Sequence, residues 1–147
     1  MGHSYCTNFV HCVFSTKDRC ESIPTEIQEK VWAYVSGIAK NEQVPLLAIG
    51  GTNNHLHLLI ALPASVSLSE AISKIKSNSS RWLGQHGSTF AWQEGYGAFS
   101  VGASQLPTVK KYIANQAEHH KKRNFEEEFV ALLKLYGVSF DPAHVYG

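Results

Sequence analysis

Hydrophobic and polar positions in the first half of the chain alternate between strand spacing and helix spacing. Residues 5–16 are rich in aromatic and β-branched types and predict a buried first strand. Apolar side chains then recur at helical intervals over residues 24–38, with a proline at the start of the helix. A second strand is expected at 44–50, and a turn over 51–54 leads into a third strand that runs to Pro63.

The second half of the chain predicts three more helices and one irregular strand. A capping-box pattern at residues 67–70 begins the next helix, and the glycine-punctuated aromatic segment 90–101 predicts an irregular strand or strand pair. Further helices are expected at 106–120 and 125–136, the last with three glutamates in its first turn and a glycine just past its end. The helix at 106–120 places four apolar side chains on its inner face, namely Leu106, Val109, Ile113 and Ala117.

The order of these elements is β-α-β-β-α-β followed by further helices, which predicts a ferredoxin-like or RRM-like α+β sandwich. In this fold an antiparallel sheet carries helices on one face, and here C-terminal helices are added. The length of 147 residues fits one domain over residues 1–147.

Composition and charge indicate a globular protein of the cytoplasm. The chain is 44% hydrophobic and 17% charged, and no apolar run approaches the roughly 20 residues that a membrane span needs. The N-terminus has no basic segment followed by an apolar stretch, so no secretion signal is expected. The three cysteines lack a C-x-x-C spacing and are expected to be reduced thiols. The net charge of +1 is small, so binding to nucleic acid must be judged from local clusters of charge.

A pair of histidines stands in the predicted third strand, within "GGTNNHLHLLIALP". Alternate residues of a strand face the same way, so His55 and His57 point to one side about 6 to 7 Å apart, while Leu56 between them points into the core. Two imidazoles so placed can bind one divalent ion. Two hydrogen-bonded or surface histidines would give the same pattern. His11, in the first strand, is expected to be a hydrogen-bonded core histidine, and a position near this pair is the alternative.

Several other metal and nucleotide sites are excluded by the residues present. A triple-histidine nucleotide motif would need a histidine at position 59, which is Leu59. The chain has neither H-E-x-x-H nor a G-x-x-x-x-G-K-[ST] phosphate loop. Asp18 and Asp141 are its only aspartates, which argues against a two-metal nuclease built on a carboxylate cluster.

The predicted helix at 106–120 offers a third ligand and a nucleophile. Tyr112 and Gln116 are four residues apart and therefore share a helix face, at the border between the apolar stripe and solvent. The amide oxygen of Gln116 can join two imidazoles around an ion, and the phenol oxygen of Tyr112 can attack a phosphorus atom. A tyrosine packed at a helix border and a surface amide are the alternatives for these two residues.

Four motifs in order and spacing resemble the small single-tyrosine HUH transposases of bacterial insertion sequences and their repeat-associated relatives. They are "FST" followed by Lys17, "NHLHLLI", "WQEGYGAFSV" and "VKKYIANQ". The resemblance runs from about Tyr5 to the C-terminal "FDPAHVYG". It implies a ferredoxin-like enzyme that works as a homodimer and that cuts and rejoins single-stranded DNA next to hairpins.

The resemblance also implies roles for individual residues. His55, His57 and Gln116 would hold a divalent metal, Mg²⁺ or Mn²⁺, and Tyr112 would become linked to a DNA 5′ phosphate. In such proteins the tyrosine helix can complete the active site of the other subunit, and the sequence leaves open whether it does so here. The family usually has an acidic residue before the first histidine, and Asn54 at this position puts a supporting role there in doubt.

Six cationic side chains are candidates for contacts with DNA phosphates. They are Lys17, Lys74, Arg81, Lys121, Lys122 and Arg123. Solvated surface positions, and for the last three an interaction with the negative end of the preceding helix, are the alternatives.

Two other functions are compatible with the sequence. One is a domesticated, catalytically silent protein that binds DNA hairpins, against which the intact candidate residues argue. The other is a metal phosphoesterase for small molecules that uses the histidine pair without Tyr112.

Overall fold

The protein is described here from a computed structural model, which covers residues 2–85 and 89–146. Its centre is a four-stranded antiparallel sheet with the strand order β2-β3-β1-β4. The strands are β1 (Phe9–Ser15), β2 (Leu46–Gly51), β3 (His55–Ala61) and β4 (Gly97–Val101). The two central strands, β1 and β3, are therefore each paired on both sides.

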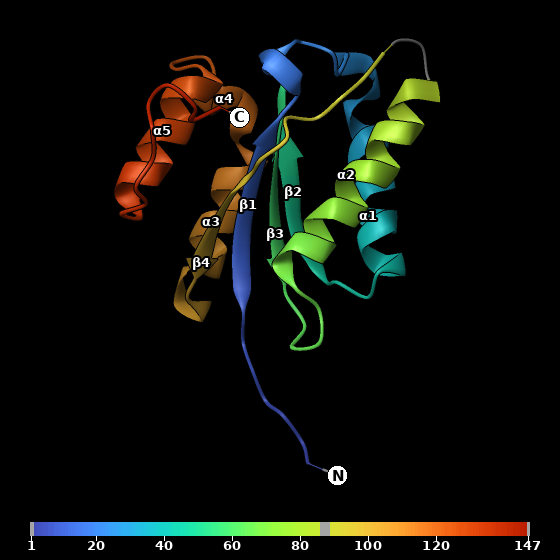
Figure 1. Ribbon diagram of the computed structural model, residues 1–147, viewed down its shortest axis with the longest axis vertical. Helices are drawn as coiled ribbons and strands as arrows, with labels where there is room; N and C mark the ends of the chain where they lie inside the picture. The colour runs from blue at the N-terminus through green and yellow to red at the C-terminus, as the bar shows by residue number, and fades with distance from the viewer. Residues whose placement is uncertain (1, 86–88, 147) are drawn as a thin grey trace.

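Helices cover both faces of this sheet (Figure 1). Helices α1 (Gln28–Asn41) and α2 (Leu68–Gln85) lie on one side, and the C-terminal helices lie on the other. The latter are α3 (Leu106–Ala114), α4 (Gln116–His119) and α5 (Phe125–Leu135). The predicted α+β sandwich with added C-terminal helices is confirmed. None of the helices in the described part of the chain is long and apolar enough to span a membrane.

Side-chain alternation on the central strands divides the core into two layers. On β3, Leu56, Leu58 and Ile60 pack in the cluster formed with α1 and α2, as predicted for Leu56. His55 and His57, between them in sequence, are also fully buried, on the face that α3 and α5 cover. One strand thus carries an entirely apolar face and a face with two imidazoles.

The predicted helix at 106–120 is wrong in one respect, because it is broken at Asn115. Asn115 has φ −101° and ψ 24°, and its N–H donates to the carbonyls at the end of α3. The change of direction turns Gln116 into the interior, where it is 1% exposed, and leaves Ala117 exposed. Ala117 therefore does not belong to the inner face, whereas Ile113 does.

The remaining boundaries differ modestly from the prediction. β1 begins at Phe9, and α1 begins at Gln28 after a 3-10 turn over Thr25–Ile27. Of the aromatic segment 90–101 only Gly97–Val101 is a strand, and before it Trp92 makes a single bridge to Thr16. The segment is irregular because Gln93 inserts its side-chain oxygen against the Ser15 N–H at 2.7 Å.

A close contact between β2 and α3 depends on Gly50. A Cβ atom at this position would overlap the backbone carbonyl oxygen of Ile113. Only glycine lets the α3 backbone lie this near to the sheet. This contact sets the distance between α3 and the sheet, and therefore the distance of Tyr112 from β3.

Candidate metal and tyrosine site

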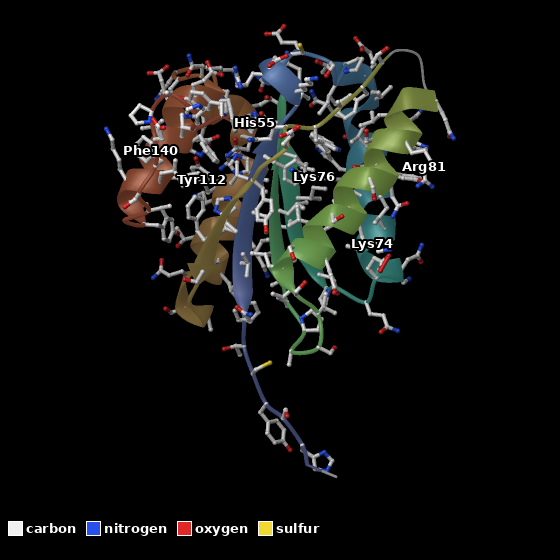
Figure 2. All side chains as sticks on the ribbon, in the orientation of Figure 1. His55, Lys74, Lys76, Arg81, Tyr112 and Phe140 are labelled. Carbon is white, nitrogen blue, oxygen red and sulfur yellow. The ribbon has the colours of Figure 1, made fainter. Side chains whose placement is uncertain are left out.

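The histidine pair lies at the start of β3, on the face of the sheet that contacts α4 and α5. Figure 2 shows His55 near the upper end of the sheet, with Tyr112 below it on the side of the C-terminal helices. His55 and His57 are each 0% exposed, and their ring centroids are 5.1 Å apart. One nitrogen of each ring and a carboxylate oxygen of Glu128 lie within 4.8 Å of one another. Glu128 comes from α5 and is likewise 0% exposed.

The two oxygens of Glu128 face different partners. Oε1 lies 3.1 Å from His57 Nε2, 3.0 Å from His120 Nε2 and 3.5 Å from His55 Nε2. Oε2 accepts a hydrogen bond from the hydroxyl of Tyr112. A single carboxylate therefore joins the candidate metal ligands to the candidate nucleophile.

Sequence reasoning missed this role of Glu128, because the three glutamates of α5 were interpreted together as a favourable first turn. In the structure Glu127 completes the capping box with Asn124, while Glu128 points inward. A signal was available in the spacing: Glu128 is three residues after Phe125 and four before Leu132, within the apolar stripe. A carboxylate in such a stripe must have partners.

Gln116, the first residue of α4, contacts the first histidine of the pair. Its Oε1 lies 2.9 Å from His55 Nε2, so the predicted set of His55, His57 and Gln116 does come together. The second nitrogen of His55, Nδ1, lies 2.9 Å from Asn54 Oδ1 and 3.0 Å from Thr52 Oγ1. Asn54 therefore contacts the first histidine although it is not acidic.

Tyr112 is half-buried beside the histidines of the same chain. Its ring packs against His57, with centroids 5.8 Å apart, and against His119 at 4.6 Å. His11 is also close, with its ring 6.1 Å from that of Tyr112 and its Nε2 2.8 Å from His57 Nδ1. His11 is a buried, hydrogen-bonded histidine, as expected, and it is also a direct neighbour of the pair.

Burial sets the charge states of this cluster. It lowers the pKa of His55 to about 3 and that of His11 to about 3, and the nearby His57 adds to both effects. Burial also disfavours the charged form of Glu128, but hydrogen bonds from His120 and His57 outweigh it and hold the pKa of that carboxyl well below its usual range. Burial and then the contact with Glu128 raise the pKa of the Tyr112 phenol. Burial therefore favours the neutral forms of His11 and His55, while the carboxyl of Glu128 stays ionised.

The donor set fits a divalent cation. Two imidazole nitrogens, a carboxylate oxygen and an amide oxygen are ligands that Mn²⁺ and Zn²⁺ accept, and the oxygen donors also suit Mg²⁺. Among the described residues no lysine or arginine is buried as deeply as Glu128. A bound cation would offset the charge of Glu128.

Tyr112 also borders two cavities of different character. One, of about 340 Å³, lies along α3 and has mainly apolar walls, which include Val101, Val109 and Leu132. The other, of about 550 Å³, is lined by polar and charged side chains, which are Asn115, Glu118, His119, Lys122 and Arg123, and is called the basic cavity here because of Lys122 and Arg123. Tyr112 therefore lines both an apolar cavity and the basic cavity.

The candidate DNA-binding cations fall into separate groups. Lys122 and Arg123 line the basic cavity beside Tyr112, and Lys121 next to them pairs with Glu118 at 3.0 Å. These residues lie in the turn that joins α4 to α5.

The other three cations lie away from this cavity. Lys17 is exposed just after β1. Lys74 and Arg81 are exposed on α2, on the opposite side of the sheet from Tyr112 (Figure 2). The structure therefore does not bring the six predicted contacts onto one surface.

Comparison with known proteins gives consistent matches. A family model described as "Transposase IS200 like" matches residues 5–116. A crystal structure described as that of a candidate transposase from Deinococcus radiodurans R1 is 20% identical with a TM-score of 0.62, and the match covers 79% of this chain and 96% of that chain. A REP-associated tyrosine transposase bound to a REP hairpin is 13% identical with a TM-score of 0.62, and the match covers 82% of this chain and 73% of that chain. These two structures show the shared fold, and no curated protein matches the chain.

Proposed function

The chain belongs to the family of IS200-like transposases, and on this premise we propose that it cuts and rejoins single-stranded DNA through a tyrosine nucleophile. The observation that carries the proposal is the position of Tyr112. Its hydroxyl donates to Glu128, whose other oxygen faces His55 and His57. A nucleophile, a proton acceptor and a set of metal ligands are thereby within contact of one another.

His55, His57 and Glu128 would hold a divalent ion, Mg²⁺ or Mn²⁺, with Gln116 as a further ligand. When bound, such an ion would polarise the oxygens of a phosphate and offset the charge that develops on them. Glu128 would link the two halves of the site, because its Oε2 already contacts the phenol.

The proposed reaction exchanges one phosphate ester for another. The Tyr112 oxygen attacks the scissile phosphorus, a bond forms between them, and the bond from phosphorus to the 3′ oxygen breaks. The phenol proton passes to Glu128 Oε2, the acceptor to which it is already hydrogen-bonded, and the leaving 3′ oxygen takes a proton from solvent water to become a hydroxyl. A 3′ hydroxyl from another strand can reverse the exchange, so no nucleotide hydrolysis is needed.

The DNA strand would approach Tyr112 over the basic cavity. Lys122 and Arg123 line that cavity and are placed to contact phosphates next to the cleavage site, with Lys121 beside them. Lys17, Lys74 and Arg81 lie away from this cavity, and we assign them to contacts with DNA that is farther from the cleavage site. A hairpin is the proposed partner there, because the similar REP-associated transposase is bound to one.

The tyrosine and the histidines of one chain already meet, which supports an active site assembled in cis. A homodimer that exchanges tyrosine helices between subunits, as the resemblance implies, stays a prediction. The two arrangements differ when Tyr112→Phe protein is mixed with His57→Ala protein. Cleavage by the mixture would reveal exchange, whereas an inactive mixture supports assembly in cis.

The direct test is the intact mass of the protein after incubation with single-stranded oligonucleotides from the flanks of its gene. With Mn²⁺ the wild type should gain the mass of a DNA fragment, and EDTA or Tyr112→Phe should abolish the adduct. Cleavage by Tyr112→Phe at the wild-type rate would contradict the proposal and favour a phosphoesterase. Tight hairpin binding without any adduct would favour a domesticated, silent binding protein.

A further inference from the structure

His11 lies on the strand next to the histidine pair and contacts only one member of it. β1 and β3 are antiparallel neighbours, and His11 Nε2 lies 2.8 Å from His57 Nδ1. The two rings are stacked, with centroids 5.1 Å apart and planes at 29°. Both rings are buried, at 2% and 0% exposure.

The hydrogen bonds of His57 determine what His11 must do. His57 Nε2 faces Glu128, so Nε2 is the nitrogen directed at the metal site, and Nδ1 faces His11. A neutral imidazole carries one proton. When a neutral, metal-free His57 carries that proton on Nε2, this nitrogen donates to Glu128, and Nδ1 is the nitrogen that accepts from His11 Nε2–H.

Metal binding reverses the direction of this contact. Nε2 can bind a cation only through its lone pair, so the proton of neutral His57 must then lie on Nδ1. The facing nitrogen of His11 must in turn become an acceptor, and its own proton must move to Nδ1 of His11. Both rings remain neutral, and the pair gains or loses no proton overall.

We propose that His11 is a positioning residue that holds His57 in both states, as a donor without the metal and as an acceptor with it. The inference rests on the metal site proposed above and adds a residue that does not touch the ion. His55 needs no such partner, because Asn54 Oδ1 and Thr52 Oγ1 already lie next to its Nδ1. A partner of this kind typically contributes a factor of about 10 to 100 to metal affinity.

Two substitutions separate this role from simple packing. His11→Phe keeps an aromatic ring against Phe99 and Tyr112 but can neither donate to His57 nor accept from it. His11→Gln has an amide that can do either, so it should preserve both states. Phe99→Leu disturbs the packing around His11 without removing a polar atom, and serves as the matched control.

The experiment measures Zn²⁺ binding by titration calorimetry, together with the midpoint of thermal unfolding of each metal-free variant. Zn²⁺ is the probe because it accepts these ligands and is diamagnetic. His11→Phe should weaken Zn²⁺ binding about 10- to 100-fold, whereas His11→Gln and Phe99→Leu should bind close to wild type. Equal affinities for His11→Phe and wild type, or equal losses in His11→Phe and His11→Gln, would overturn the inference.

Long-range ¹H–¹⁵N spectra of histidine-labelled wild type give a second readout that does not depend on activity. Both rings should carry Nε2–H in the metal-free protein and Nδ1–H in the Zn²⁺-loaded protein. A His11 ring that keeps Nε2–H in the Zn²⁺-loaded protein would overturn the role of His11 but leave the metal site itself intact. Absence of Zn²⁺ binding by the wild type would instead overturn the metal site itself, and this role with it.

Discussion

The buried imidazoles should make the metal-free protein sensitive to mild acid. His11 and His55 each have a pKa of about 3 in the folded state, compared with 6.5 for an ordinary histidine, because burial disfavours their charged forms. Between these values the unfolded chain binds a proton at each histidine that the folded chain does not. Stability is therefore fully present above about pH 6.5 and falls as the pH drops from 6.5 toward 3.

The size of the effect follows from the shift. Each pH unit below 6.5 costs about 1.4 kcal/mol for each such histidine. At pH 5.5 the two together should lower the free energy of unfolding by about 3 kcal/mol, a large part of the roughly 5 to 15 kcal/mol of a typical domain. Glu128, whose pKa is lowered on folding, adds a further loss only below about pH 4.5.

Urea denaturation in EDTA at pH 7.5 and pH 5.5 measures this difference. His11→Gln removes one of the two groups and should lose about half of the dependence on pH. An unfolding free energy that is equal at the two pH values, or a full dependence in His11→Gln, would refute the reasoning.

Three further changes test other parts of the structure. Glu128→Gln should lower the free energy of unfolding by about 2 kcal/mol, because the hydrogen bonds to this side chain lose a charged acceptor. It should also weaken Mn²⁺ binding measured by calorimetry, and unchanged binding would show that Glu128 is not a metal ligand. Gly50→Ala should lower the free energy of unfolding by about 1 to 3 kcal/mol and reduce adduct formation, because its Cβ would push α3 away from the sheet. Gly84→Ala on α2, where the Cβ meets open space, is the control, and equal stability of the two variants would contradict the close contact at Gly50. Arg123→Ala should reduce the slope of log binding constant against log salt by about 1 for an oligonucleotide, and Lys134→Ala should not; an unchanged slope would place Arg123 off the DNA.

Features that depend on local spacing could be predicted from the sequence. The alternation in β3 gave two histidines on one side and Leu56 on the other, and the structure has this arrangement. The four-residue spacing of Tyr112 and Gln116 predicted that the two share a helix face, and the resemblance assigned both to the histidine site. Both do lie beside the histidines, even though the helix breaks between them at Asn115. The break did not matter because Gln116 directly follows it and turns inward.

Features that depend on how distant segments pack could not be predicted in the same way. His11 meets His57 only because β1 and β3 pair in a particular register, and 46 residues separate the two in sequence. Glu128 reaches the site only because the chain turns between α4 and α5, which brings it next to His120. The capping box formed by Asn124 and Glu127 explained the acidic first turn of α5, so the sequence did not show that Glu128 points inward. Local patterns place side chains on a face, but the partner of each face is decided by topology.

The segment after the family match is therefore part of the site and not an appendage to it. The match ends at residue 116, yet Glu128 is buried with partners that all come from the candidate site: His57, His120 and Tyr112. A buried carboxylate is costly unless such donors surround it, and removing it would leave those donors without an acceptor. Folding of α5 and assembly of the site consequently depend on the same contacts. The interior can accommodate the charge of Glu128 because the hydroxyl of Tyr112 and the imidazoles of His57 and His120 surround its oxygens.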